Sequence, residues 1–215
     1  YMDEWMIQRK IRMGTDMKEK VIVVASGNAG KIREFKEILE PLGYTVKAQS
    51  ELPPIEEVEE TGTTFHDNAI LKAQAITDAF GIMAVSDDSG LEIDALDRKP
   101  GVYSARWLGH DTPYDVKNAQ VLDMLKDVKD RTCRYVCAIA VTRPGNKPVV
   151  FEDSVECVVA LEARGTNGFG YDPIILYEPM GKTMAEMSRD EKNSISHRGK
   201  AVRKFEKWLN ETDTH

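Results

Sequence analysis

Residues 84–106 read AVSDDSGLEIDALDRKPGVYSAR, and the predicted fold is organised around this stretch. The apolar run at residues 82–85 predicts a strand that leads directly into two adjacent acids, Asp87 and Asp88. Clustered carboxylates at the end of an apolar strand are a common way to present a hard cation at the edge of a sheet. A Ser-Gly pair follows at once, and Asp, Ser and Gly also favour solvated turns. The stretch alone therefore leaves a metal site and an ordinary turn open.

The segment before it predicts a strand, a polar loop and a helix. The β-branched run VIVVA at residues 21–25 favours a buried parallel strand, and apolar residues then recur at helical spacing up to Leu42. The loop between them, SGNAGK at residues 26–31, would present backbone N–H groups at a helix start, where phosphate binds well. It is not a Walker A motif, because that motif needs Gly at position 25 and Ser or Thr at position 32. An ordinary turn with a solvated Lys31 also stays open.

The remaining pattern alternates helices and strands. A helix over residues 65–80 precedes the central stretch, and a clean alternation at residues 91–95 predicts a strand after it. Thr112 and Pro113 are expected to open a helix with Val116, Ala119, Leu122 and Leu125 on its apolar face. Residues 131–142 and 148–161 predict a β-hairpin that forms the body of a second lobe. Ser196 is expected to cap a last helix, with His197 and Arg198 in its first turn.

Composition limits the class of protein. The chain has 215 residues and a formal net charge of −7, which argues against nucleic-acid binding. Three cysteines without a framework spacing favour reduced, buried thiols in a cytoplasmic protein over a zinc site. There is no apolar run of the length that a membrane span needs. Residues 1–20 are predicted to be a poorly ordered N-terminal extension, before a single domain at residues 21–212.

Charged residues gather at the predicted element boundaries. The basic ones are Lys31, Lys192 and the pair His197-Arg198, and the acidic ones are the pairs Glu59-Glu60 and Asp87-Asp88. Cations that hold phosphates, with carboxylates that hold Mg²⁺, indicate nucleotide phosphoryl chemistry. The Gly-rich aromatic loop at residues 165–172 would offer a stacking surface for a base.

Six motifs together resemble those of the inosine triphosphate pyrophosphatase family. They are SGNAGK at 26–31, EETGTTFHDNA at 59–69, SDDSGL at 86–91, PGVYSAR at 100–106, GFGYDP at 168–173 and EKNSISHRGKA at 191–201. Each motif is weak alone, but all six occur in the family's order and cover nearly the whole chain after residue 21.

The resemblance implies an α/β fold with a long mixed central sheet, flanking helices, and two lobes with an active-site cleft between them. It also implies a Mg²⁺-dependent homodimer. Such an enzyme cleaves non-standard purine nucleoside triphosphates (ITP, dITP and XTP) to the monophosphate and pyrophosphate.

The resemblance also assigns roles to individual residues. Asp88 would be the catalytic base and a Mg²⁺ ligand, and Glu60 a second metal carboxylate. Because neighbouring strand residues point to opposite faces, Asp87 and Asp88 cannot both face one metal, so Asp87 is expected to support the turn. Asp67 stands where the family often has Glu and is left out of the metal site. The residues expected to contact substrate are Ser26, Gly27, Asn28, Ala29, Gly30, Lys31, Ser89, Phe169, Gly170, Tyr171, Asp172, Lys192, His197 and Arg198.

Three alternatives remain at this point. One is the related septum-inhibitor type of pyrophosphatase, which acts on modified pyrimidine triphosphates. Another is a nucleotide-binding protein without catalytic activity, against which Lys31, Glu60 and Asp88 argue. The third is a P-loop kinase or NTPase, against which the broken Walker pattern argues.

Overall fold

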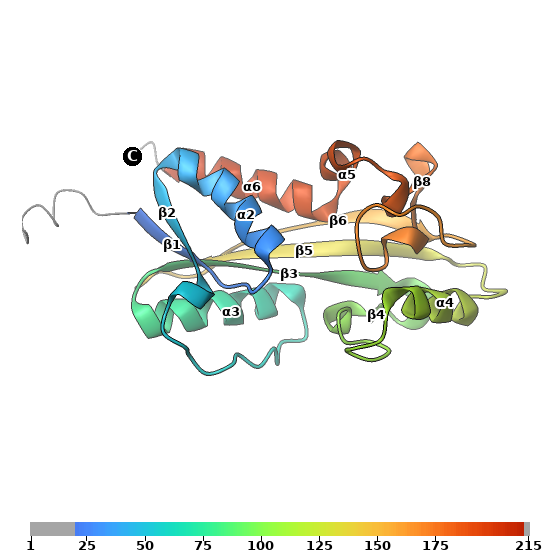
Figure 1. Cartoon of the computed structure of the whole chain (residues 1–215), viewed down its shortest axis with the longest axis horizontal. Helices are drawn as coiled ribbons and strands as arrows, with labels where there is room; N and C mark the ends of the chain where they lie inside the picture. The colour runs from blue at the N-terminus through green and yellow to red at the C-terminus, as the bar shows by residue number, and fades with distance from the viewer. Residues whose placement is uncertain (1–19, 213–215) are drawn as a thin grey trace, which may run out of the picture.

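The computed structural model describes residues 20–212 as one mixed eight-stranded sheet with helices on both faces (Figure 1). Lys20 belongs to the first strand, and the predicted extension otherwise lies outside the described residues. The strands are β1 (Lys20–Val24), β2 (Tyr44–Ala48), β3 (Met83–Ile93), β4 (Lys99–Pro100), β5 (Thr132–Thr142), β6 (Val149–Val159), β7 (Ile175–Tyr177) and β8 (Lys182–Thr183). The α-helices are α2 (Ala29–Leu39), α3 (Phe65–Phe80), α4 (Tyr114–Met124), α5 (Arg189–Ile195) and α6 (His197–Thr212). Short 3₁₀ turns lie at Glu40–Leu42, Gln49–Glu51, Asp94–Leu96, Gly101–Tyr103, Asp172–Ile174, Glu178–Met180 and Met184–Glu186.

The strand order β2-β1-β3-β5-β6-β7-β8 explains why the sheet is mixed. β1 pairs in parallel with both β2 and β3, as the continuous apolar run of β1 predicts. From β3 onward all pairings are antiparallel. The predicted mixed sheet with flanking helices is therefore confirmed, and β3 stands where the parallel part meets the antiparallel part.

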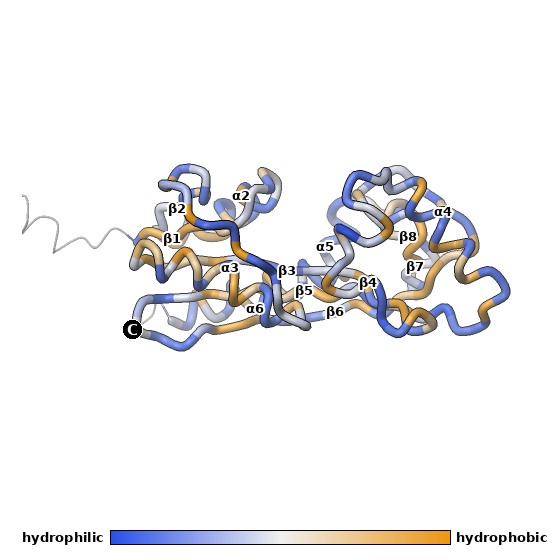
Figure 2. Tube along the Cα trace, turned by 90° about the horizontal axis from the view of Figure 1, so that it is seen from below, coloured by the Kyte–Doolittle hydropathy of each residue, from blue (hydrophilic) through white to orange (hydrophobic). Residues whose placement is uncertain are grey.

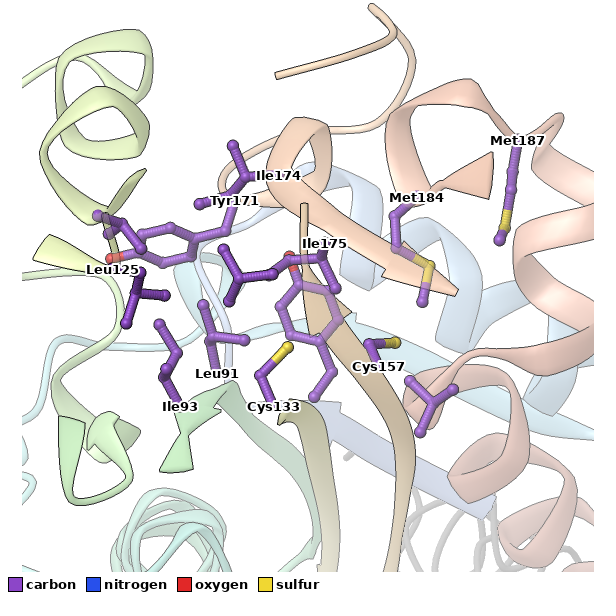
Figure 3. Packing of buried hydrophobic residues seen from close by; sticks show 14 residues of the cluster. Leu91, Ile93, Leu125, Cys133, Cys157, Tyr171, Ile174, Ile175, Met184 and Met187 are labelled. Carbon is purple, nitrogen blue, oxygen red and sulfur yellow. The ribbon is translucent and has the colours of Figure 1, made fainter. Parts of the chain in front are cut away.

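Apolar side chains pack on both faces of this sheet. Helices α2 and α6 lie on one face of the sheet and α3 lies on the other (Figure 1). Phe35 of α2 packs with Phe205 of α6, whereas Phe65 and Ile76 of α3 belong to a separate cluster. A third cluster, at the far ends of β3, β5 and β6, includes Cys133 and Cys157 (Figure 3). All three cysteines are free and buried, as predicted. Alternate residues of β3 therefore face opposite sides of the sheet, one side packed against α2 and α6 and the other against α3.

The predicted turn at Ser89-Gly90 is wrong. β3 continues without a break from Met83 to Ile93, because Ser89 and Gly90 pair with Cys137 and Val136 of β5. Gly90 allows close packing rather than a turn, since a Cβ there would lie 2.8 Å from the Phe65 ring. Asp87 and Asp88 therefore lie within a long central strand and not at a strand end.

The hairpin and α4 also differ from expectation. β5 pairs with β3 along ten residues, and β3, β5 and β6 run between two groups of elements (Figure 2), so the hairpin is not confined to a second lobe. α4 begins at Tyr114, and neither Thr112 nor Pro113 caps it with a side chain. Its buried face carries Lys117 and Asn118 rather than Val116 and Ala119, because these polar side chains donate hydrogen bonds to backbone carbonyls.

Candidate functional site

The SGNAGK loop forms the start of α2. Asn28 caps this helix, and its side-chain oxygen accepts hydrogen bonds from the backbone N–H groups of Gly30 and Lys31 at 2.9 and 3.2 Å. The Ser26 hydroxyl oxygen accepts a hydrogen bond from the backbone N–H of Asn28, which holds the residues just before the helix in place. Residues 27–30 are exposed. The loop is therefore ordered before any ligand arrives, and the positive end of the helix dipole faces solvent beside Lys31.

Asp87 is a buried carboxylate held by two cations. Its side chain is 2% exposed, lies 3.2 Å from Lys31 Nζ, and accepts a hydrogen bond from Arg198 at the start of α6. Arg198 also donates through Nε to Glu34 of α2 at 2.7 Å. Burial alone would raise the pKa of Asp87, but Lys31, Arg198 and Lys72 outweigh it and lower this pKa to about 2. Asp87 is therefore ionised at neutral pH and ties α2 to α6.

Asp88 points to the opposite face of β3 and has a different environment. Lys72 of α3 lies 3.8 Å from Asp88 and 3.4 Å from Glu60, and its ammonium group also donates to the backbone oxygen of Asp87 at 2.7 Å. Burial raises the pKa of Asp88 to about 6; Lys72 opposes this rise, and the carboxylates of Glu60 and Asp87 add to it. Adjacent carboxylates thus have pKa values shifted in opposite directions, which is typical of a catalytic site.

A second cluster surrounds the aromatic loop. Asp172 accepts hydrogen bonds from Tyr135, from Lys192 at 2.6 Å and from the backbone N–H of Phe169. The Phe169 side chain is exposed, and the Lys192 ammonium lies 4.8 Å from the centre of its ring. Asp172 therefore holds the loop in place, while Phe169 offers a ring face to solvent.

The start of α6 connects the two clusters. The His197 ring stacks on Tyr135 at 4.8 Å, and the next residue, Arg198, contacts Asp87. Burial, together with the nearby cations Lys192 and Arg198, lowers the pKa of His197 to about 3, so its imidazole is neutral at pH 7. Ser196 accepts from the N–H of Gly199 and caps α6, as predicted.

The carboxylates of Asp88 and Glu60 suit a Mg²⁺ ion. One oxygen of Asp88 is buried without a hydrogen-bond partner, and Lys72 brings Glu60 into the same site. Within residues 20–212, no three His, Cys, Asp or Glu side chains gather as a metal cage. Two carboxylates are a donor set that Mg²⁺ commonly takes from a protein, with waters and substrate phosphates as its other ligands.

Comparison with known proteins decides the family. The model of the Ham1 family matches residues 22–208. The chain belongs to the Ham1 family. It is 50% identical over 195 residues to a dITP/XTP pyrophosphatase of Bacillus subtilis, an alignment that covers 90% of this chain and 98% of the relative. The solved Ham1 protein of Staphylococcus aureus has 41% identity and a TM-score of 0.86, covering 90% of this chain and all of that one. A Ham1 protein from Coxiella burnetii has 40% identity and a TM-score of 0.83, with 89% and 98% covered.

Most of the predicted site residues of this Ham1 chain lie in one continuous network. The 26–31 loop meets Arg198 through Asp87, and Glu60 meets Asp88 through Lys72. Ser89 follows on β3 and is partly buried. Tyr171 is the exception, because its side chain is buried and its hydroxyl donates to the backbone oxygen of Ser104. Asp67 lies 3.3 Å from His66 Nδ1, and both of these side chains are exposed.

Sequence reasoning missed several members of this network. Asp87 was expected to support a turn, but it is the ion-paired centre between α2 and α6, so that expectation is wrong. Lys72 had one available signal: it lies four residues after Asn68, so the two polar side chains share a face of the predicted helix. Glu34 and Tyr135 gave no such signal. In the sequence, Glu34 is an ordinary polar residue of a helix, and Tyr135 is an ordinary aromatic residue of a strand.

Proposed function

We propose that this protein hydrolyses the non-standard purine nucleoside triphosphates ITP, dITP and XTP to the monophosphate and pyrophosphate in a Mg²⁺-dependent reaction. The relatives named dITP/XTP pyrophosphatase support the reaction. The observation that carries the proposal is the pair Asp87 and Asp88 on one strand. Cations of the phosphate-binding elements balance the charge of Asp87, whereas Asp88 is available as a base.

The triphosphate would bind where α2 and α6 begin. The exposed N–H groups of the 26–31 loop, Lys31 and Arg198 supply donors and positive charge for phosphate oxygens. Lys31 and Arg198 already share Asp87, which holds the two cations together despite their repulsion. Binding then requires little rearrangement of these side chains.

Asp88 would act as the general base. A pKa of about 6 leaves it ionised at pH 7 yet close enough to accept a proton from water. The water's oxygen bonds to one phosphorus of the α–β anhydride, its proton passes to Asp88, and the bridging P–O bond breaks with its electron pair on the leaving phosphate group. Mg²⁺ held by Asp88 and Glu60 would supply charge neutralisation at the phosphates.

The aromatic loop would recognise the base. Phe169 offers an exposed ring for stacking, with Lys192 beside it as a donor. A 6-oxo group accepts a hydrogen bond, whereas the 6-amino group of adenine donates one, so donors at this position leave adenine unpaired. The side chain of Asp172 already has three donors and would act mainly by holding this loop.

Product analysis tests the proposed reaction. We expect pyrophosphate from ITP, dITP and XTP with Mg²⁺, at least about 10²-fold lower kcat/KM for ATP, and no turnover with a chelator, because unpaired polar groups penalise adenine strongly. The measurement is pyrophosphate and orthophosphate release across these substrates and modified pyrimidine triphosphates. Orthophosphate as the only product, or equal rates on ATP and ITP, would contradict the proposal. A preference for modified pyrimidine triphosphates would favour the septum-inhibitor type of pyrophosphatase. Binding of these nucleotides without turnover would favour a non-catalytic nucleotide-binding protein.

Lys31→Ala tests the phosphate site. We expect the KM for ITP to rise by about 10-fold or more with kcat changed much less, because a charged hydrogen bond to phosphate contributes about 1.5–3 kcal/mol. Lys47→Ala is the matched control, because Lys47 is an exposed lysine on β2. Steady-state kinetics on both variants measure the effect. Unchanged KM and kcat in Lys31→Ala would remove the loop from the proposed site.

We also propose that the protein is a cytoplasmic homodimer with its active-site cleft between two lobes. Within residues 20–212, no helix combines the length and the apolar character of a membrane span. Sedimentation equilibrium measures the oligomeric state, and a monomer at micromolar concentration would contradict the dimer.

A further inference from the structure

Tyr135 lies inside the sheet, between the two clusters of the site. It belongs to β5, which pairs with β3 on one side and with β6 on the other, and its direct neighbours there are Leu91 and Val155. Its side chain is buried. Interior strands are among the last parts of a protein to open, because hydrogen bonds on both sides hold their backbone. Tyr135 is therefore a firm support for the elements that pack on it.

The Tyr135 hydroxyl supports the aromatic loop through Asp172. It donates a hydrogen bond to Asp172 Oδ1 at 2.9 Å, whereas Oδ2 accepts from Lys192 and from the backbone N–H of Phe169. Burial, together with the Asp172 carboxylate, raises the pKa of Tyr135, so the hydroxyl keeps its proton and is the donor at neutral pH. Asp172 is buried, and a buried carboxylate oxygen without a donor is costly. The loop that presents Phe169 is thus tied to β5 through this phenolic hydroxyl.

The Tyr135 ring supports the start of α6. His197 is the first residue of that helix, and its ring stacks on Tyr135 with centres 4.8 Å apart and planes inclined by 22°. This distance is within the range in which aromatic pairs attract each other. Arg198 follows directly and donates to Asp87. One side chain therefore supports both the loop proposed to bind the base and the helix start proposed to bind the phosphates.

A nucleoside triphosphate joins its base covalently to its phosphates, so the two halves of its site must be held at a matching separation. A site that is already arranged binds more tightly, because less side-chain and loop freedom is lost on binding. We propose that Tyr135 is a positioning residue for the nucleotide: its hydroxyl and its ring fix the Phe169 loop relative to the start of α6. This inference rests on the proposed function, because it assigns a role to a residue that supports the proposed site. Tyr135 acts on nucleotide binding without touching the substrate.

Tyr135→Phe tests the hydroxyl, because phenylalanine keeps the ring that stacks on His197. The measurement is calorimetric binding of ITP and of inorganic tripolyphosphate, which has no base, in a chelator. We expect the Kd for ITP to rise by about 5–10-fold and the Kd for tripolyphosphate to stay within about twofold. A general loss of stability would not separate the two ligands, so the difference reports the position of the aromatic loop.

Tyr177→Phe is the matched control, because Tyr177 of β7 is a half-buried tyrosine that packs against the same apolar cluster. It should leave both Kd values unchanged. Tyr135→Leu removes the ring as well, and it should weaken the binding of ITP and tripolyphosphate together, because the helix start that carries Arg198 loses its support. An unchanged Kd for ITP in folded Tyr135→Phe would overturn the inference. So would an equal loss for the two ligands, or an equal loss in Tyr177→Phe.

A crystal structure of the wild-type protein with ITP supplies a readout that does not depend on whether the variants fold. We expect the purine ring on Phe169 while the Tyr135 hydroxyl stays bonded to Asp172. A loop that moves and breaks this hydrogen bond when ITP binds would overturn the inference. Wild-type turnover of ITP with Mg²⁺, measured alongside, shows separately whether the proposed function itself holds.

Discussion

Asp88→Asn is expected to lower kcat for ITP by about 10³-fold or more and, at the same time, to make the folded protein more stable. Asparagine cannot take a proton from water at neutral pH, and general-base catalysis contributes about 10²–10⁴-fold. Asparagine has nearly the same shape as aspartate, so the packing between β3 and α3 should be kept. The loss of turnover therefore reports chemistry rather than unfolding.

The gain in stability follows from the raised pKa of Asp88. Burial raises this pKa from 3.8 to about 6, so the folded state binds a proton more tightly than the unfolded state does. The ionised group therefore destabilises the folded protein above pH 6, by about 2–3 kcal/mol at full effect, and this penalty disappears as the pH falls through 6 toward 4. A neutral asparagine removes the penalty, so without divalent ions the free energy of unfolding at pH 7.5 should rise by about 1–2 kcal/mol.

Denaturant unfolding at pH 7.5 in a chelator and at pH 4 measures this effect, with ITP kinetics run in parallel. Asp94→Asn is the matched control: Asp94 is a surface residue just after β3, bound to Arg134, and its loss should leave kcat unchanged. Near-normal kcat in folded Asp88→Asn would remove Asp88 from its proposed role. A destabilised variant at pH 7.5 would mean that Asp88 gains more from Lys72 than it loses by burial.

The difference between the two aspartates explains how far the sequence could predict this site. Alternation along a strand correctly separates Asp87 from Asp88, because neighbouring side chains face opposite sides of a sheet. The partners of each aspartate come from α2, α3 and α6, and those contacts depend on tertiary packing. Arg198 is 111 residues from Asp87 in the chain, and no local pattern specifies that pair.

Local propensity also failed at Ser89-Gly90 for a physical reason. The pair favours a turn in isolation, but ten residue pairs with β5 hold the segment extended. The helices at residues 65–80 and after Ser196 were predicted well, because their apolar spacing and caps are local signals. Glu34 and Tyr135 have ordinary local surroundings, and only the arrangement of the elements reveals their contacts with charged groups.

Asp87→Asn is expected to have the opposite effect on stability from Asp88→Asn. The pKa of Asp87 falls from 3.8 to about 2 in the folded protein, because the surrounding cations outweigh its burial. A lowered pKa means that the unfolded state binds protons more readily, so the carboxylate stabilises the fold fully above about pH 4, by about 2 kcal/mol. This contribution is lost as the pH falls from about 4 to 2.

Removing that charge also leaves Lys31 and Arg198 facing each other. Arg198 keeps Glu34, and Lys31 is 30% exposed and can be hydrated, so we expect Asp87→Asn to lower the free energy of unfolding by about 2–4 kcal/mol at pH 7. The difference from the wild type should shrink as the pH approaches 2. In wild type, the two aspartates together should place maximum stability near pH 4–5 in metal-free buffer.

Urea unfolding from pH 2 to 8 measures both curves. Asp153→Asn is the matched control, since Asp153 pairs with the exposed Lys204 at 3.0 Å, and a surface pair contributes about 0–1 kcal/mol. A loss in Asp87→Asn no larger than in Asp153→Asn would show that Asp87 does not tie α2 to α6. A loss that stayed constant down to pH 2 would assign it to packing, because only a charge effect disappears on protonation of the wild-type carboxylate.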